Sequence, residues 1–258
     1  MTTPSKPGAR LADHLDHKLK RHLARIEESE AYRLVADPKS DSELVLAFVR
    51  HALLEVFSYG PHVTEATFTA IGRFPKDRPD LMWPLIKHDL VEVNHGEMAL
   101  KDFVRLGGDA AWARERRMTP ASYAMAATCK LIGENESPFA YLGYMYPFEA
   151  LTPTLMERAV RFLAQHGFPV HARKFIDLHA EADIEHADEL RSMIVQIVDD
   201  YPGAAEAIEH AFDCFAAVYP IPVWGAALCR AKRERDRGAK RIAESGVLPQ
   251  TQSAGALS

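Results

Sequence analysis

The chain has 258 residues, of which 47% are hydrophobic and 26% are charged, and this is the composition of an ordinary globular protein. Its formal net charge of -5 gives the molecule as a whole no attraction for phosphate backbones, so nucleic acid is not an expected partner. The three cysteines, Cys129, Cys214 and Cys229, have no close spacing, which excludes a cysteine metal motif and predicts reduced thiols in a cytoplasmic protein.

The N-terminus is polar and lacks the apolar core of a secretion signal, so residues 1–10 are predicted to be a flexible segment. Residues 211–229 approach the length of a membrane span. However, Asp213, Pro220 and Pro222 favour a kinked core helix there, and no membrane partner is expected. The basic run that follows is interpreted as a solvated helix end.

Helical periodicity recurs along the chain and alternating strand patterns are scarce, so the sequence predicts an all-α fold. Proline and glycine breakers and Thr-Pro starts divide it into roughly nine helices. These are expected at residues 11–35, 41–59, 62–74, 80–106, 119–133, 139–150, 152–166, 171–201 and 204–236. Residues 237–258 are small, polar and aperiodic and are predicted to be a disordered tail, which leaves 11–236 as one helical domain.

The most informative segment lies within the expected helix 171–201, where His179, Asp183 and His186 form the pattern His-x-x-x-Asp-x-x-His. At about 100° per residue, these three side chains fall within one narrow sector of a helix. Three residues of the types that bind metals therefore converge. The other acidic residues of the segment fall elsewhere on the helix and are interpreted as a solvated face.

A second helix repeats this arrangement with His88, Glu92 and His95 at the same offsets. Glu92 and His95 form the Glu-x-x-His pair that di-iron sites of helical bundles use, because side chains three residues apart are neighbours on a helix. His88 lies one turn earlier and stays outside the main ligand set. It is interpreted as a partner that orients a ligand or as an extra ligand, with a purely structural histidine as the alternative.

Glu149 is the only acid in the apolar and aromatic run 141–150. Burying an unpaired carboxylate costs several kcal/mol, so Glu149 either meets a cation or marks a helix end that is open to water. The resulting set of three carboxylates and three imidazoles, without a thiolate, suits iron, or alternatively manganese, better than a structural zinc site. Two divalent cations held by six ligands would keep positions open for water, dioxygen or substrate.

In chain order, the pair Glu92 and His95, the lone Glu149, and the pattern of His179, Asp183 and His186 resemble the haem-oxygenase-like di-iron oxidases and oxygenases. By fold, these are relatives of thiaminase-II-type and pyrroloquinoline-quinone-forming enzymes. The resemblance spans most of 11–236 and points to a di-iron member, because the cofactor-free relatives lack the full ligand set. It implies a single haem-oxygenase-like helical bundle that binds two iron ions and uses dioxygen as co-substrate.

The expected function is therefore the dioxygen-dependent oxidation of a small organic substrate, of the amino-acid or fatty-acid type, by a non-haem di-iron enzyme. Candidate pocket walls are the aromatic residues of the apolar segments, although such stripes are more often core: Phe57, Tyr59, Phe68, Phe139, Tyr144 and Phe148. The family that the chain resembles performs N-oxygenation, desaturation and C–C cleavage, and the sequence does not indicate which of these reactions applies. The electron donor is also open, and a homodimer is expected because related folds are often dimers.

Two alternatives remain open at this point. A ferritin-like iron-storage or ferroxidase protein needs a Glu from each of two helices and Glu-x-x-His from each of two others. Here the second pair is Asp183 and His186, and a third histidine replaces a carboxylate. A metal-free helical enzyme of the thiaminase-II type would act by acid and base chemistry, but it would leave the convergent histidines unexplained.

Overall fold

The computed structural model of the chain describes residues 6–182 and 184–245. No strand occurs in these ranges, and the predicted all-α class is confirmed. The α-helices are α1 (Pro7–Glu28), α2 (Glu30–Ala36), α3 (Ser42–Gly72), α4 (Pro79–Glu92), α5 (His95–Arg105), α6 (Ala110–Glu115), α7 (Pro120–Asn135), α8 (Tyr141–Gln165), α9 (Lys174–Ala182), α10 (Ile184–Asp200), α11 (Ala204–Val218) and α12 (Ile221–Ser245). Two short 3-10 helices, η1 (Pro138–Ala140) and η2 (Val170–Ala172), precede α8 and α9.

Two long helices continue where the sequence analysis predicted a break. Helix α3 passes through Pro61, where separate helices 41–59 and 62–74 were predicted. Helix α8 passes through Pro153, where a new helix was predicted to start, and also contains Pro147, which lay inside the predicted helix 139–150. A proline inside a helix removes one backbone hydrogen bond and costs about 3 kcal/mol. Both helices bury apolar side chains on either side of their prolines, and this packing outweighs the cost.

Elsewhere the chain breaks where one long helix was predicted. The expected helix 80–106 is α4 and α5, separated at Val93 and Asn94, and the expected helix 11–35 is α1 and α2, with Ser29 as the N-cap of α2. The expected helix 204–236 is likewise divided, into α11 and α12. The expected helix 171–201 starts later than predicted, since η2 ends at Ala172 and α9 begins at Lys174; α9 and α10 lie on either side of residue 183, which is outside the described residues. The short helix α6 was not predicted at all.

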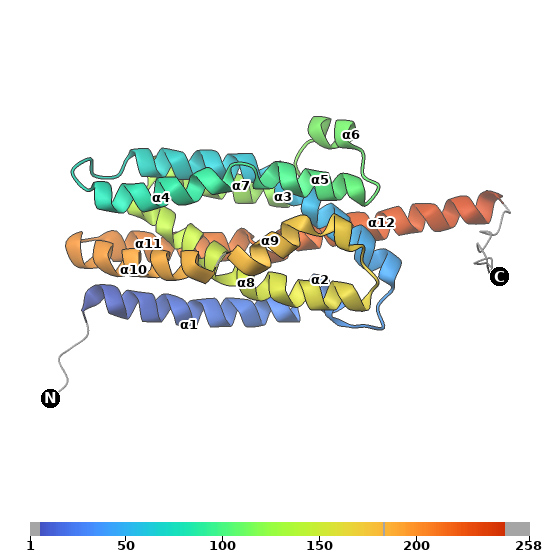
Figure 1. Cartoon of the computed structure of the whole chain (residues 1–258), viewed down its shortest axis with the longest axis horizontal. Helices are drawn as coiled ribbons and strands as arrows, with labels where there is room; N and C mark the ends of the chain where they lie inside the picture. Colours follow the sequence, from blue (N-terminus) through green and yellow to red (C-terminus); the bar gives the residue numbers. More distant parts are fainter. Residues whose placement is uncertain (1–5, 183, 246–258) are drawn as a thin grey trace, which may run out of the picture.

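The two ends of the helical region also differ from the prediction. Helix α1 already begins at Pro7, so part of the expected flexible segment 1–10 is helical. Helix α12 continues to Ser245, past the predicted start of a disordered tail at 237, and residues 246–258 lie outside the described part of the chain. The end of α12 extends beyond the other helices (Figure 1). A helix end outside the bundle needs no apolar face, and this is why helical periodicity weakens there.

The helices run mostly along the long axis of the molecule (Figure 1). Helix α3 packs against α5, α7 and α12, and α8 packs against α9, α10 and α11. Large side chains that are almost wholly buried, such as Tyr141, Tyr144, Phe212 and Phe215, fill the core. The two central helices α3 and α8 thereby hold α4, α5, α9 and α10 at fixed positions around the space described below.

Two helical segments, Ser42–Gly72 and Ala204–Arg237, are long and apolar enough to cross a membrane when judged by length and composition alone. Half of the most apolar window of the first is buried inside the bundle, as expected for a core helix. The second is interrupted between α11 and α12 and buries Phe212, Phe215 and Val223 in the core. These two segments are therefore weak evidence for a membrane.

His22 connects α1 to the link between α11 and α12. Its Nε2 donates to the carbonyl oxygen of Tyr219 at 2.9 Å. Burial lowers the pKa of His22 below its ordinary value of 6.5, although the bond to Tyr219 opposes the shift. The unfolded chain thus binds a proton at His22 more readily than the folded chain. This contribution to stability is complete above pH 6.5 and is lost as the pH falls towards the folded pKa.

The substitution His22→Gln is therefore expected to make the free energy of unfolding less dependent on pH between about 7.5 and about 5.5. Glutamine can still donate to the Tyr219 carbonyl but does not titrate. His51, whose pKa burial also lowers, would contribute equally to both proteins and leave a residual slope. Urea unfolding at the two pH values measures the difference, and an unchanged slope in the variant would contradict this role of His22.

Candidate metal centre

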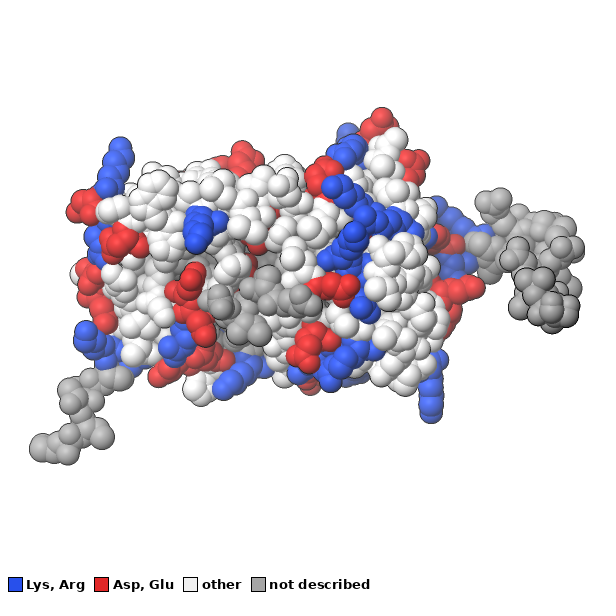
Figure 2. All heavy atoms as spheres, viewed as in Figure 1, with Lys and Arg blue, Asp and Glu red and all other residues white. Residues whose placement is uncertain are grey.

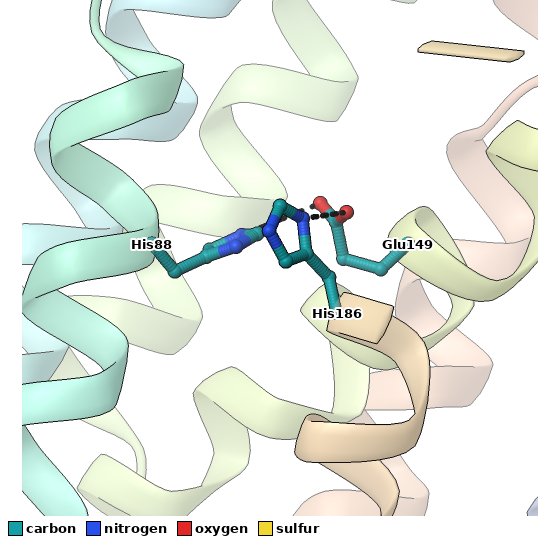
Figure 3. A group of neighbouring side chains, drawn as sticks. All are labelled: His88, Glu149 and His186. Atoms are coloured by element: carbon teal, nitrogen blue, oxygen red, sulfur yellow. Dashed lines mark ion pairs between the residues drawn. The ribbon is translucent and has the colours of Figure 1, made fainter. Parts of the chain in front are cut away.

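Side chains of metal-binding types converge where α4, α5, α8, α9 and α10 meet. The structure places them in two groups of three: His88, Glu149 and His186, called the His88 group, and Glu92, His95 and His179, called the Glu92 group. In each group the candidate ligand atoms all lie within 4.8 Å of one another. Figure 3 shows how the three side chains of the His88 group, from α4, α8 and α10, point toward one spot. Asp183, the remaining predicted ligand, lies outside the described residues.

In the His88 group, one carboxylate faces two imidazoles. Glu149 Oε1 lies 3.5 Å from His88 Nε2, and Glu149 Oε2 lies 3.7 Å from His186 Nδ1. The two imidazole rings meet edge to face, with 4.5 Å between their centroids. Because the side chains of His88 and Glu149 are each only 6% exposed, little water reaches this contact.

The electrostatics of the His88 group keep Glu149 ionised. Burial by itself would raise the pKa of Glu149, but His186 and His88 outweigh it and lower the pKa to about 2. Burial would lower the pKa of His88, yet Glu149, with smaller contributions from Asp89 and Glu92, raises it to about 9. The group therefore holds a buried negative charge that requires a positive partner, either a proton on an imidazole or a metal ion.

The Glu92 group lies at the break between α4 and α5. Glu92 is the last residue of α4 and His95 is the first of α5, and His95 Nδ1 lies 2.5 Å from Glu92 Oε2. The imidazole of His179 stands 4.6 Å from that of His95, measured between ring centroids. The predicted Glu-x-x-His pair thus converges across a helix break and not along one continuous helix.

A backbone carbonyl sets the proton position of His179. Its Nδ1 lies 2.7 Å from the carbonyl oxygen of Phe175, which can only accept, so Nδ1 carries the hydrogen. Burial lowers the pKa of His179 and keeps the ring neutral, although the bond to Phe175 opposes the shift. A neutral ring with its proton on Nδ1 leaves the Nε2 lone pair for a metal ion, which is the usual arrangement of a histidine ligand.

The unsatisfied atoms of both groups fit a pair of cations. His88 Nε2 and His95 Nδ1 are buried, and neither makes a hydrogen bond within the described ranges although each faces a carboxylate oxygen. Buried polar atoms are normally hydrogen-bonded, and here each nitrogen has a carboxylate oxygen beside it as its ionic partner, so a cation bound by the imidazole and the carboxylate together would satisfy both atoms. Each group supplies two imidazoles and one carboxylate, the donor set that suits iron(II) with open coordination positions.

The structure changes the interpretation of His88, which the sequence analysis kept outside the ligand set. His88 belongs to one of the two groups, since its Nε2 faces Glu149 on α8 and its ring meets that of His186 on α10. Its offset from Glu92, the same as that of His179 from Asp183, was the sequence signal for this role. Sequence reasoning missed Asp89, which is 2% exposed and whose pKa burial raises to about 7.

A cavity of about 220 Å³ extends away from the two groups. Glu92, His95, Glu149 and His179 line its metal end, and mostly apolar residues of α2, α3, α8 and α9 form the remaining walls. On α8 the lining continues from Glu149 to Leu163, which corresponds to about 21 Å at 1.5 Å per residue. The cavity is therefore elongated, with a polar end and an apolar end.

Three of the predicted pocket aromatics, Phe57, Tyr59 and Phe148, line this cavity. The other three do not. Phe139 packs edge-on against Phe74 in the core, and Tyr144 is buried with its hydroxyl 3.2 Å from that of Thr67. Phe68 follows Thr67, which does line the cavity, and consecutive residues of a helix face directions about 100° apart.

Comparisons with known proteins agree with this architecture. A model of a family described as iron-containing redox enzymes matches residues 50–219, which include every member of both groups. A solved domain of unknown function with a haem-oxygenase-like fold, from Shewanella denitrificans, is 17% identical with a TM-score of 0.73; the match covers 93% of this chain and 98% of that one. A TenA homolog from Pseudomonas syringae pv. tomato is also 17% identical, with a TM-score of 0.66, and the match covers 88% of this chain and 93% of that one. These likenesses show the haem-oxygenase-like fold, and no curated protein matches the chain.

Proposed function

The chain belongs to the family of iron-containing redox enzymes, and from this premise we propose that it is a non-haem di-iron enzyme that uses dioxygen to oxidise a small, elongated and mostly apolar molecule. The observation that carries the proposal is the pair of adjacent groups, each made of two histidines and one glutamate. Such a set is typical of iron-dependent oxygenases, because three protein ligands leave the metal open to other molecules.

The bound iron ions would supply the electron transfer to dioxygen that amino-acid side chains cannot supply. His88, Glu149 and His186 would hold one ion, and Glu92, His95 and His179 the other. The carbonyl of Phe175 keeps His179 in the tautomer that presents Nε2. The apolar walls beyond these residues would keep water away from the reacting atoms, which limits side reactions.

The shape of the cavity favours a substrate of the fatty-acid type over an amino acid. Away from the metal end, the cavity walls on α2 and on the N-terminal half of α3 are formed by residues such as Val35, Phe48 and Leu53. An apolar chain that lies along them is removed from water, and this stabilises the complex by about 25 cal/mol for each Å² of apolar surface buried. A free amino acid would place little surface there and would leave most of the cavity unused.

Anaerobic titration with ferrous iron tests the function. We expect two iron ions per chain, followed on exposure to oxygen by oxygen consumption that is faster with fatty acids than with amino acids. A transient visible absorption would report the reaction at the metal centre. Many irons per chain would favour an iron-storage protein, and no bound iron would favour a metal-free enzyme; either result would overturn the proposal.

Filling the apolar end of the cavity should change the preferred chain length. Ala159 lines the cavity ten residues beyond Glu149 on α8, about 15 Å along the helix. We expect Ala159→Phe to weaken binding of long straight-chain fatty acids while short ones bind as before, because the added ring occupies the space of the distal carbons. Ala164→Phe, at an exposed position of the same helix, is the control. Calorimetric titration measures both, and an unchanged preference in Ala159→Phe would contradict the assigned cavity.

A further inference from the structure

A second concave region, an open groove, lies on the outside of α3. One wall is the stretch 57–62 of α3, and the other is the chain from the end of α6 into α7. Three arginines line the groove, namely Arg114, Arg116 and Arg117, and in the described part of the chain no Asp or Glu side chain does so. Surface charges are mixed over the face shown in Figure 2, with Lys and Arg gathered over α5 near α6. The groove is therefore locally basic on a chain whose net charge is negative.

Arg116 is an arginine with an unused donor. Its side chain is only 4% exposed, and Nη2 donates to Glu55 Oε1 at 3.0 Å. Its Nη1 is buried and makes no hydrogen bond to any residue that the structure describes. Glu55 is also approached by Arg230 at 3.9 Å, so two guanidinium groups share one carboxylate. The inner wall of the groove therefore carries a net positive charge.

The other two arginines are available to an incoming anion. Arg117 is exposed, and across the described ranges no carboxylate lies within ion-pair distance of it. Arg114 forms two 2.8 Å bonds with Glu97, but both side chains are about half exposed. Exposed ion pairs contribute little to stability, so Glu97 can be replaced by another anion at small cost.

The groove shares a wall with the metal end of the inner cavity. Phe57 and Pro61 line both spaces, and the Arg114 guanidinium lies over the ring of Phe57, 5.5 Å from its centroid. Gly96, which follows the candidate ligand His95, also faces this wall: a Cβ built on it would lie 3.7 Å from Pro61 Cδ. Only one layer of side chains therefore separates the basic groove from the space beside the Glu92 group.

We propose that the groove binds the anionic group, a carboxylate or a phosphate monoester, of the same molecule whose apolar part occupies the inner cavity. This inference rests on the proposed function. Arg116 and Arg117 donate to the anion, because guanidinium groups bind both oxyanions through paired hydrogen bonds. Arg114 exchanges Glu97 for the ligand, which releases the ring of Phe57 and opens the shared wall.

Three probes with the same alkyl chain separate charge recognition from chain recognition: dodecanoate, dodecyl phosphate and dodecanol. Each is titrated calorimetrically into the iron-loaded full chain without oxygen. We expect Arg117→Gln to weaken binding of both anions roughly fivefold, the effect of about 1 kcal/mol, and to leave dodecanol binding unchanged. Arg161→Gln, at an exposed position on α8, is the matched control. Arg116 is left intact because the buried Glu55 depends on it.

The relative affinity of the two anions identifies the preferred group, and a loss in either one upon Arg117→Gln supports the groove. The proposal is overturned if both anions bind Arg117→Gln as tightly as the parent chain, or if dodecanol binding weakens equally. In the first of these cases, a parallel titration of the iron-free chain in which dodecanoate binds more weakly would place the carboxylate at the metal centre. In each of these cases dodecanol bound to the parent chain still supports the inner cavity, whereas its failure to bind would count against the proposed substrate class.

Discussion

Replacement of His179 by alanine is expected to lower the iron content from two ions per chain to one and to abolish iron-dependent oxygen consumption. His179 is 7% exposed, and its Nδ1 is held by the Phe175 carbonyl, so its Nε2 is directed to the Glu92 group. Without it that group keeps one imidazole and one carboxylate. Even the loss of a residue that only orients a ligand lowers metal affinity about 10-fold to 100-fold, and the loss of the ligand itself should exceed this.

The two groups can be tested separately. His88→Ala should likewise remove one iron ion, but from the other group, because His88 faces Glu149 and His186. Glu92→Ala should behave as His179→Ala does. His171→Ala, at an exposed histidine in η2, is the control that removes an imidazole without touching either group. Iron analysis, an oxygen electrode and circular dichroism give the content, the activity and the helicity.

Two results with these variants would contradict the ligand assignments. If His88→Ala retained two iron ions and full oxygen consumption, the assignment of His88 as a ligand would be wrong, and its earlier interpretation as a partner or structural residue would return. If His179→Ala did so, the Glu92 group would not be a metal site. Retained helicity in both variants is expected, since each removes a single side chain and leaves the helix backbone and the apolar core unchanged.

Replacement of Glu55 by glutamine is expected to be the most destabilising single change, at about 3 to 5 kcal/mol, because it leaves a buried positive charge without its partner. The side chain of Glu55 is fully buried and that of Arg116 is 4% exposed. The carboxylate also accepts hydrogen bonds of 2.6 Å from the hydroxyls of Thr119 and Ser122. Glutamine fills the same space but offers only one acceptor oxygen and no charge.

The same substitution on the same helix provides the control. Glu65 also lies on α3 and pairs with Lys130 at 2.9 Å, but its side chain is 60% exposed. Glu65→Gln should therefore change the midpoint of urea unfolding little. A comparable midpoint for the two variants would show that the buried pair of Glu55 and Arg116 is not a main contributor to stability.

The sequence predicted which parts of the chain are helical, with α6 as the exception, but not where neighbouring helices join or divide. Breakers such as Gly60-Pro61 mark local preferences of the backbone, and those preferences amount to a few kcal/mol at most. Burial of apolar side chains along α3 exceeds them, so that helix continues. At Val93 and Asn94 the opposite occurs: local periodicity favours a single helix, yet α4 ends at Glu92 and α5 begins at His95, with the two side chains still in contact across the break.

For the candidate site, helical periodicity alone placed each candidate ligand on one face of its own helix. The separation of an amphipathic helix into faces depends only on the order of residues along the chain, which is why Glu92, His95, His179 and His186 could be named without a structure. Glu149 was recognised for a similar local reason, as a lone charge in an apolar run.

Tertiary structure decided how these residues are grouped. Whether Glu149 faces the histidines of α4 and α10 or those of α5 and α9 depends on how five helices pack, and no local pattern encodes distances between residues far apart in the chain. The same packing brought His88 into the site, gave the cavity its length and set Arg114 over the ring of Phe57. The sequence by itself thus determined which chemistry is available, and only the fold determined which atoms meet.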